Sequence, residues 1–127
     1  MVRVAVVGAG YWGPNLIRNF AACPDTHLAA VCDRDESRLA KGFAGYAGVE
    51  AIPNFDDLLA RADIDAVAIA TPVSTHAPMG IAALSAGKHV LIEKPLAASV
   101  SDAVELVETA RRVGRILMVD HIYVYSG

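Results

Sequence analysis

The chain has 127 residues, of which 54% are hydrophobic and only 6% aromatic, and its formal net charge is −3. This length suits a single domain, and the aliphatic composition suits a buried parallel sheet covered by helices. The acidic balance and the absence of a basic stripe argue against nucleic acid as a partner.

Two further features bear on where the protein works. The opening apolar run follows Met1 directly, contains Arg3 and stops at a glycine turn, so it has the character of neither a signal peptide nor a membrane span. Cys23 and Cys32 show no C-x-x-C spacing and no matching pair of histidines, so neither a disulfide nor a metal site is expected. We therefore expect a cytoplasmic protein with two reduced cysteines and no membrane partner.

The motif on which the interpretation depends lies near the N-terminus. Residues 2–7 are a nearly continuous apolar run, typical of a strand buried on both faces, and residues 15–20 continue with helical periodicity. Between them Gly8, Gly10 and Gly13 have G-x-G-x-x-G spacing, which predicts a dinucleotide-binding turn. Gly8 would permit a tight turn, Gly10 would let a pyrophosphate approach the backbone, and Gly13 would let helix and strand pack closely. The alternative is a glycine-rich turn that binds no ligand.

An acidic residue further along the chain supports the dinucleotide interpretation. The run at residues 27–32 predicts a second strand, which ends on Asp33, twenty positions after Gly13. A carboxylate there suits the hydroxyl groups of the adenosine ribose, whereas it would repel a 2′-phosphate. NAD is therefore favoured over NADP as the cofactor. Arg34 leaves the point open, because its guanidinium could pair with a 2′-phosphate or stack on adenine.

The rest of the chain alternates between helical and strand patterns. Six strands and five helices predict an α/β fold, a doubly wound parallel sheet of order 3-2-1-4-5-6. Asn54 and Ser99 are expected to cap helices, and the last helix has its apolar positions at Val100, Val104, Val107, Ala110 and Val113. After the first helix, the expected helices lie at 35–46, 54–62, 74–86 and 99–113, and the later strands at 49–52, 65–70, 88–92 and 115–119.

In such a sheet the ligand binds beyond the carboxyl ends of the strands, where the strand order reverses. Thr71 and Pro72 follow the fourth strand and should border the cofactor, unless they form an ordinary loop with a turn-forming proline. His76, in the first turn of the next helix, would hydrogen-bond the nicotinamide ribose or a substrate. The alternative is a solvated or helix-capping histidine.

Lys94 and His121 are the candidate catalytic residues. Because Lys94 precedes Pro95, its backbone is biased towards an extended conformation, which would direct the ammonium across the strand ends towards the nicotinamide. A lysine there can hold a substrate hydroxyl and lower the pKa of that alcohol as hydride leaves. The alternative is a surface lysine. His121, with Asp120, would serve as an acid, a base or an orienting group.

Together these motifs resemble those of the Gfo/Idh/MocA oxidoreductases. The resemblance implies a Rossmann-type domain in which the backbone at Tyr11 and Trp12 binds the pyrophosphate, Asp33 and Arg34 border the adenosine ribose, and Lys94 is the catalytic-site lysine. The run GYWGPNLIRNF is similar to members that act on nucleotide-linked sugars, such as UDP-N-acetylglucosaminuronate 3-dehydrogenases. The motifs cover the whole chain: GAGYWG at 8–13, CDRD at 32–35, ATP at 70–72, His76 and EKPLA at 93–97. Gly8, Gly10, Gly13, Thr71, Pro72, His76 and Glu93 complete the predicted cofactor-binding set.

The resemblance implies an NAD-dependent oxidoreductase that transfers hydride between nicotinamide and a hydroxyl-bearing carbon of a sugar or sugar derivative. Members of the family also have a C-terminal domain for substrate binding and oligomerisation, so residues 1–127 are expected to be an inactive, truncated cofactor domain. Asp120 stands where many relatives have glycine, which leaves the role of His121 open. Apolar surface around residues 122–125 is expected to cause self-association. The alternative function is a stand-alone dinucleotide-binding module that senses redox state without catalysis.

Overall fold

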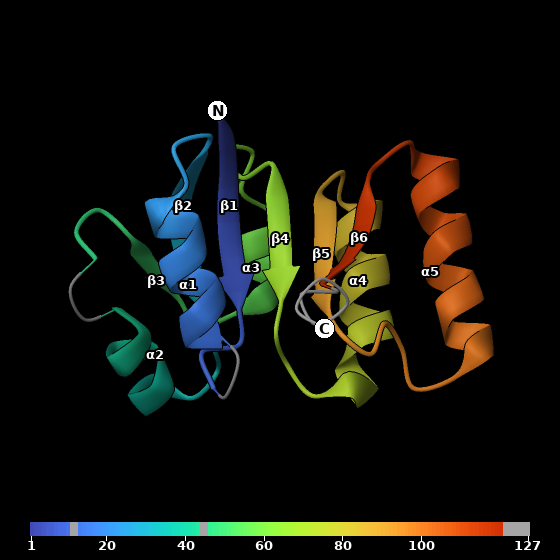
Figure 1. The fold of residues 1–127 in the computed structure, drawn as a ribbon, viewed down its shortest axis with the longest axis horizontal. Coiled ribbons are helices and arrows are strands. Elements are labelled where there is room, and N and C mark those ends of the chain that lie inside the picture. Colours follow the sequence, from blue (N-terminus) through green and yellow to red (C-terminus); the bar gives the residue numbers. More distant parts are fainter. Residues whose placement is uncertain (11–12, 44–45, 121–127) are drawn as a thin grey trace, which may run out of the picture.

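The structure is a computed structural model that describes residues 1–10, 13–43 and 46–120. Six strands form one parallel sheet in the order β3-β2-β1-β4-β5-β6, which confirms the predicted fold class and strand order (Figure 1). The strands are β1 (Val2–Val7), β2 (Thr26–Cys32), β3 (Glu50–Ile52), β4 (Ala66–Ile69), β5 (His89–Glu93) and β6 (Leu117–Asp120). The helices are α1 (Gly13–Ala22), α2 (Glu36–Phe43), α3 (Phe55–Leu59), α4 (His76–Ser85) and α5 (Val100–Val113), and a 3₁₀ turn, η1 (Val73–Thr75), precedes α4.

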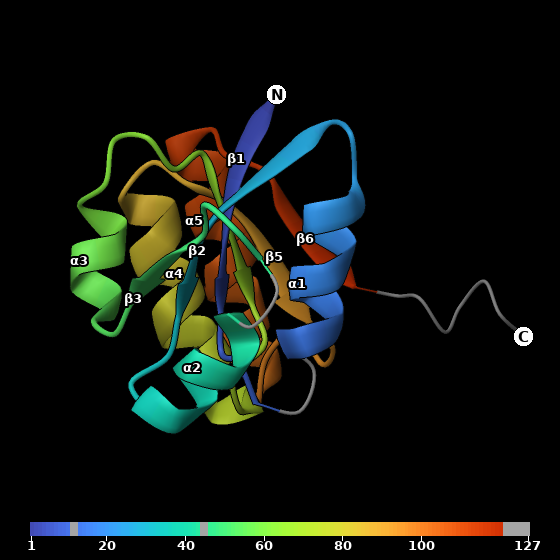
Figure 2. The same cartoon turned by 90° about the vertical axis from the view of Figure 1, so that its left-hand side faces the viewer.

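Helices cover the sheet on both faces, and each face has its own hydrophobic core (Figure 2). Leu16 and Ile17 of α1 and Leu39 of α2 pack on one face. Leu58 of α3, Leu84 of α4 and Leu106 of α5 belong to the core on the other face. The central strands β1 and β4 are buried between these layers, which explains why their sequences are almost continuously apolar.

The predicted capping residues Asn54 and Ser99 cap the first turns of α3 and α5, as expected. The side chain of Asn54 accepts a hydrogen bond from the Asp57 amide at 3.1 Å, and that of Ser99 accepts one from the Asp102 amide at 3.2 Å. Gly114 closes α5 in the left-handed conformation, with φ = +70°. Helix α3 ends earlier than predicted, at Leu59, because the chain turns at its cap residue, Ala60.

Helix α5 faces the sheet with a different side from the one expected. Val100, Val104 and Val107 are exposed, whereas Leu106, Thr109 and Ala110 are buried. The cause lies on α4, where Gly80 leaves space for Leu106: a Cβ at Gly80 would lie 2.6 Å from Leu106 Cδ2. Burial of Thr109 costs little because its hydroxyl donates to the Glu105 carbonyl at 2.7 Å. The expectation was therefore wrong for Val100, Val104 and Val107. It was right for Ala110, which is buried, and for Val113, which packs against the core.

Candidate dinucleotide site

The sheet register brings four strand ends into one row. Val7 of β1 pairs with Cys32 of β2 and with Ile69 of β4, and Ile69 pairs with Ile92 of β5. The residues that follow these strand ends therefore lie side by side at the lower edge of the sheet in Figure 1. This edge includes five of the predicted site residues: Gly8, Asp33, Thr71, Glu93, which is the last residue of β5, and Lys94.

The glycine turn connects the end of β1 to α1 through very close packing. Gly8 has φ = +96°, a conformation that residues with a side chain rarely adopt. A Cβ at Gly13 would lie only 1.8 Å from the Gly8 carbonyl oxygen, so the helix can approach the strand only with glycine there. A Cβ at Gly10, in contrast, would have only the Arg38 guanidinium within 4 Å among the described residues. Tyr11 and Trp12 lie outside the described residues.

The Asp33 carboxylate is turned towards this glycine turn. Its Oδ2 accepts a hydrogen bond from the Ala9 amide at 2.9 Å, and its Oδ1 accepts one from the Asp35 amide, also at 2.9 Å. The residue is half-buried. A carboxylate in this position borders the turn and the end of β2, where an adenosine ribose would lie if a dinucleotide crossed the strand ends.

Arg38 is a site residue that sequence reasoning missed. It lies in the first turns of α2, and its Nη1 would be 3.5 Å from a Cβ at Gly10, while its Nε is 3.7 Å from Asp35 Oδ2. The Arg38 guanidinium therefore lies beside the turn. The predicted neighbour Arg34 is exposed. The sequence feature that could have pointed to Arg38 is its position three residues after Asp35, the residue that caps α2.

The Asp35 carboxylate caps α2 by accepting hydrogen bonds from several donors. Its Oδ1 accepts hydrogen bonds from the Ser37 amide at 3.0 Å, the Ser37 hydroxyl at 2.9 Å and the Arg38 amide at 3.3 Å. These contacts, the Ser37 hydroxyl first among them, hold the pKa of the Asp35 carboxyl below its usual value. The carboxylate charge is thus retained beside the arginine that faces Gly10.

Thr71 and Pro72 form a hydrogen-bonded turn after β4. The Thr71 hydroxyl lies 2.6 Å from that of Thr75, which also donates to the Pro72 carbonyl at 2.6 Å. Pro72 is exposed and precedes η1. Thr75 is the residue before α4, but its side chain does not cap that helix, because its hydroxyl is used within the turn.

His76 is buried, with 2% of its surface exposed, so the alternative of a solvated histidine is wrong. Its Nδ1 lies 2.8 Å from the Pro95 carbonyl oxygen, and its Nε2 lies 2.7 Å from the Thr71 carbonyl oxygen. Both ring nitrogens are thus engaged by protein groups. Contact with a ligand would require the imidazole to leave one of these partners.

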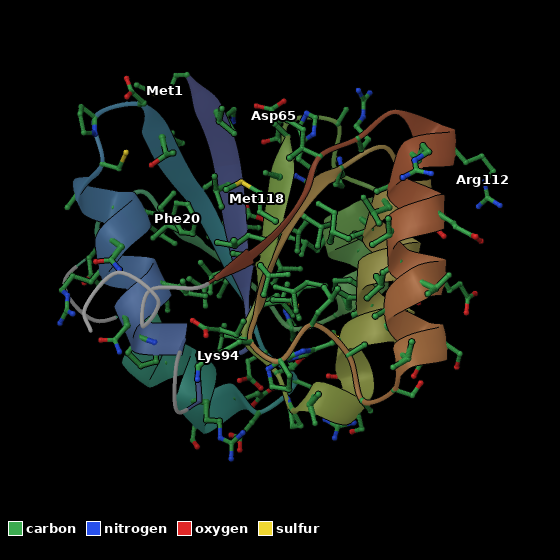
Figure 3. All side chains as sticks on the ribbon, turned by 45° about the vertical axis from the view of Figure 1, so that its right-hand side comes forward. Met1, Phe20, Asp65, Lys94, Arg112 and Met118 are labelled. Atoms are coloured by element: carbon green, nitrogen blue, oxygen red, sulfur yellow. The ribbon has the colours of Figure 1, made fainter. Side chains whose placement is uncertain are left out.

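Lys94 is exposed and directly follows β5, which ends at Glu93 (Figure 3). In that view Lys94 lies at the end of the sheet opposite to Met1 and Asp65. The peptide bond between Lys94 and Pro95 is cis. Glu93 pairs with Asp120 in the register of β5 and β6, and His121 lies outside the described residues.

Cys32 precedes Asp33 and is buried. Burial, with a smaller contribution from the Asp33 charge, raises the pKa of its thiol to about 12, so Cys32 remains a thiol at neutral pH. In the part of the chain that the structure describes, no group of three or more His, Cys, Asp or Glu side chains is arranged to hold a metal ion. No helix among these residues has the length and hydropathy needed to cross a membrane.

The fold and the arrangement of strand ends define a class of nucleotide-binding protein, and the comparison with known families agrees. Residues 2–121 match the model of the GFO_IDH_MocA family, described as an oxidoreductase family with an NAD-binding Rossmann fold. The chain belongs to this family. It contains the Rossmann domain with which the family binds nicotinamide dinucleotides.

Several relatives act on sugar nucleotides or are bound to nicotinamide cofactors. The chain is 43% identical over 125 residues to a dTDP-3,4-didehydro-2,6-dideoxy-alpha-D-glucose 3-reductase of Streptomyces violaceoruber, covering 98% of this chain and 36% of the relative. The crystal structure of KijD10, a 3-ketoreductase from Actinomadura kijaniata in complex with NADP and TDP-benzene, has a TM-score of 0.91 at 33% identity, covering 98% of this chain and 38% of KijD10. GenD2 from gentamicin A biosynthesis, in complex with NAD, has a TM-score of 0.92 at 34% identity, covering 98% of this chain and 35% of GenD2. The chain thus spans little more than a third of the length of these relatives.

Proposed function

We propose that this chain is the NAD(H)-binding domain of an oxidoreductase that moves a hydride between the cofactor and a hydroxyl-bearing carbon of a nucleotide-linked sugar. The observation that carries this proposal is the Asp33 carboxylate, which borders the glycine turn and bonds the Ala9 amide. The sugar substrate rests on the relatives, which include a dTDP-sugar 3-reductase and a ketoreductase with a bound TDP compound.

The surroundings of Gly10, which is half-buried, support the approach of a pyrophosphate to this turn. Among the described residues, only the Arg38 guanidinium lies near a Cβ placed on Gly10, and a guanidinium is a good partner for phosphate oxygens. Helix α1 begins at Gly13 and has no acidic residue in its first turn, so its positive end is not neutralised by its own side chains. Tyr11 and Trp12 would contribute backbone amides.

The charges around the second strand end favour a ribose over a 2′-phosphate. Residues 33–38 contain three carboxylates and two guanidinium groups, so this segment has one net negative charge. Asp33 would lie at the ribose position, where its carboxylate accepts hydrogen bonds from the Ala9 and Asp35 amides. A 2′-phosphate would have to approach these carboxylates, which is unfavourable at close range. We therefore propose NAD(H) rather than NADP(H), although relatives bind either cofactor.

Lys94 and the β4–α4 turn would border the reactive end of the cofactor. The nicotinamide ring of a bound cofactor supplies the hydride chemistry. Lys94 would donate a hydrogen bond to the substrate oxygen and lower the pKa of the alcohol, with His121 as a further proton donor or acceptor. Thr71, Pro72 and Glu93 would line the same edge. The isolated 127-residue chain, which spans little more than a third of the length of these relatives, is proposed to bind the cofactor and to turn over no substrate.

Titration calorimetry of the 127-residue chain with NADH and NADPH tests the cofactor proposal. We expect NADH to bind about tenfold more tightly or better, which corresponds to about 1.4 kcal/mol. Asp33→Asn removes the charge with little change of shape. It should reduce the preference for NADH over NADPH, mainly by improving NADPH binding. Arg34→Gln is the matched control at the neighbouring exposed position and should not improve NADPH binding. Tighter binding of NADPH by the unmodified chain would contradict the role of Asp33.

A further inference from the structure

His76 connects two segments that are distant in the sequence. It is the first residue of α4, and it lies between the carbonyl of Thr71, which follows β4, and the carbonyl of Pro95, which follows β5. Pro95 is nineteen residues from His76 along the chain. In Figure 1 the segment after β5 passes the start of α4 at the lower edge of the sheet. The imidazole therefore bridges the two loops at this edge.

The bridge depends on how many of the two ring nitrogens carry a hydrogen atom. A carbonyl oxygen is only an acceptor, so each of the two contacts, at 2.8 and 2.7 Å, needs an N–H donor on the imidazole. A neutral imidazole has one N–H group and an imidazolium has two. In a neutral ring one nitrogen lone pair would face a carbonyl lone pair in a buried place, which is unfavourable.

His76 is almost fully buried at the start of α4, so both contacts lie inside the protein. An N–H donor on each ring nitrogen satisfies both carbonyl oxygens there.

We propose that His76 is a positioning residue whose imidazolium donates to both carbonyls and ties the Lys94–Pro95 segment to the end of β4. Lys94 is the residue directly before the tethered Pro95, so the tether fixes where the lysine leaves the sheet. The bridge itself stands on the geometry alone, and only the catalytic use of Lys94 rests on the proposed function. His76 thus acts through another residue and does not contact the substrate.

Nitrogen NMR of the histidine rings tests the bridge without any cofactor. The chain has four histidines and is labelled with ¹⁵N at the ring positions. At neutral pH we expect both nitrogens of His76, assigned through its backbone connectivities, to show the signals of protonated nitrogens. His89 is an internal control, because its Nδ1 accepts a hydrogen bond from the Ile116 amide at 3.0 Å and must therefore carry no proton. A spectrum in which His76 shows one unprotonated nitrogen would overturn the bridge.

A variant tests the positioning of Lys94. His76→Gln offers its donors on a single nitrogen and cannot reproduce the two-sided bridge. We expect the backbone amide signals of Lys94 and Leu96 to shift in this variant, while that of Lys88 at the opposite end of β5 stays unchanged. Unchanged Lys94 and Leu96 signals in a folded variant would overturn the positioning role. If the variant does not fold, the ring spectrum of the unmodified chain still decides whether the bridge, on which the positioning depends, exists. Failure to bind NADH would overturn the proposed function and leave both NMR results as they stand.

Discussion

At the scale of single residues, the site depends on three glycines that do different work. Gly8 is needed for its backbone conformation and Gly13 for the absence of a side chain against the Gly8 carbonyl. Gly10 has neither constraint among the described residues, because a Cβ there would meet only the end of the flexible Arg38 side chain. The conformational roles expected for Gly8 and Gly13 are thus present in the folded chain. This agrees with the proposal that Gly10 lets a ligand approach the backbone.

This difference predicts opposite outcomes for two alanine substitutions. Gly13→Ala should lower the free energy of unfolding by about 3 kcal/mol or more, because helix and strand must move apart. Gly10→Ala should change it by less than about 1 kcal/mol, because among the described residues only the end of the Arg38 side chain lies within 4 Å of the added Cβ. Gly10→Ala should nevertheless weaken NADH binding strongly. Urea unfolding and calorimetry measure both quantities, and unchanged NADH affinity in Gly10→Ala would argue against a pyrophosphate at this turn.

At the scale of secondary-structure elements, the strands and most helix boundaries were predictable because local signals determine them. Buried parallel strands are apolar runs, and caps such as Asn54 and Ser99 are recognisable from their own neighbours. The packing face of α5 was not predictable, because it depends on the space at Gly80 of another helix. The positions of Arg38 and His76 were also not predictable from local sequence. Arg38 lies beside Gly10 because of where α2 packs, and His76 is held by the carbonyl of Pro95, nineteen residues away.

The packing of α5 predicts a contrast between two of its apolar side chains. Leu106 is fully buried, so Leu106→Ala should lower the free energy of unfolding by about 2–4 kcal/mol. Val104 is 49% exposed, so Val104→Gln should lower it by less than about 1 kcal/mol. Thermal or urea unfolding of the two variants gives the comparison. A larger loss for Val104→Gln would mean that α5 packs through its valine face after all.

At the scale of the whole molecule, the two ends of the sheet have different characters. The end at the start of the strands is held by structural contacts: Arg3 bonds the Asp63 carbonyl at 2.8 Å, and buried Lys88 donates to the Ile64 carbonyl at 2.8 Å. The opposite end carries the glycine turn, Asp33 and Lys94. Membership of an oxidoreductase family with an NAD-binding Rossmann fold agrees with the proposal that the cofactor binds at this opposite end.

The central claim is that a dinucleotide binds across the carboxyl ends of the strands, and an NADH titration followed by backbone amide NMR tests it most directly. The account predicts that signals of Gly8, Ala9, Asp33 and Thr71 shift together with a single affinity, while signals of Arg3 and Lys88 at the other end do not change. Shifts confined to the end with Arg3 and Lys88, or no shifts at millimolar NADH, would contradict it.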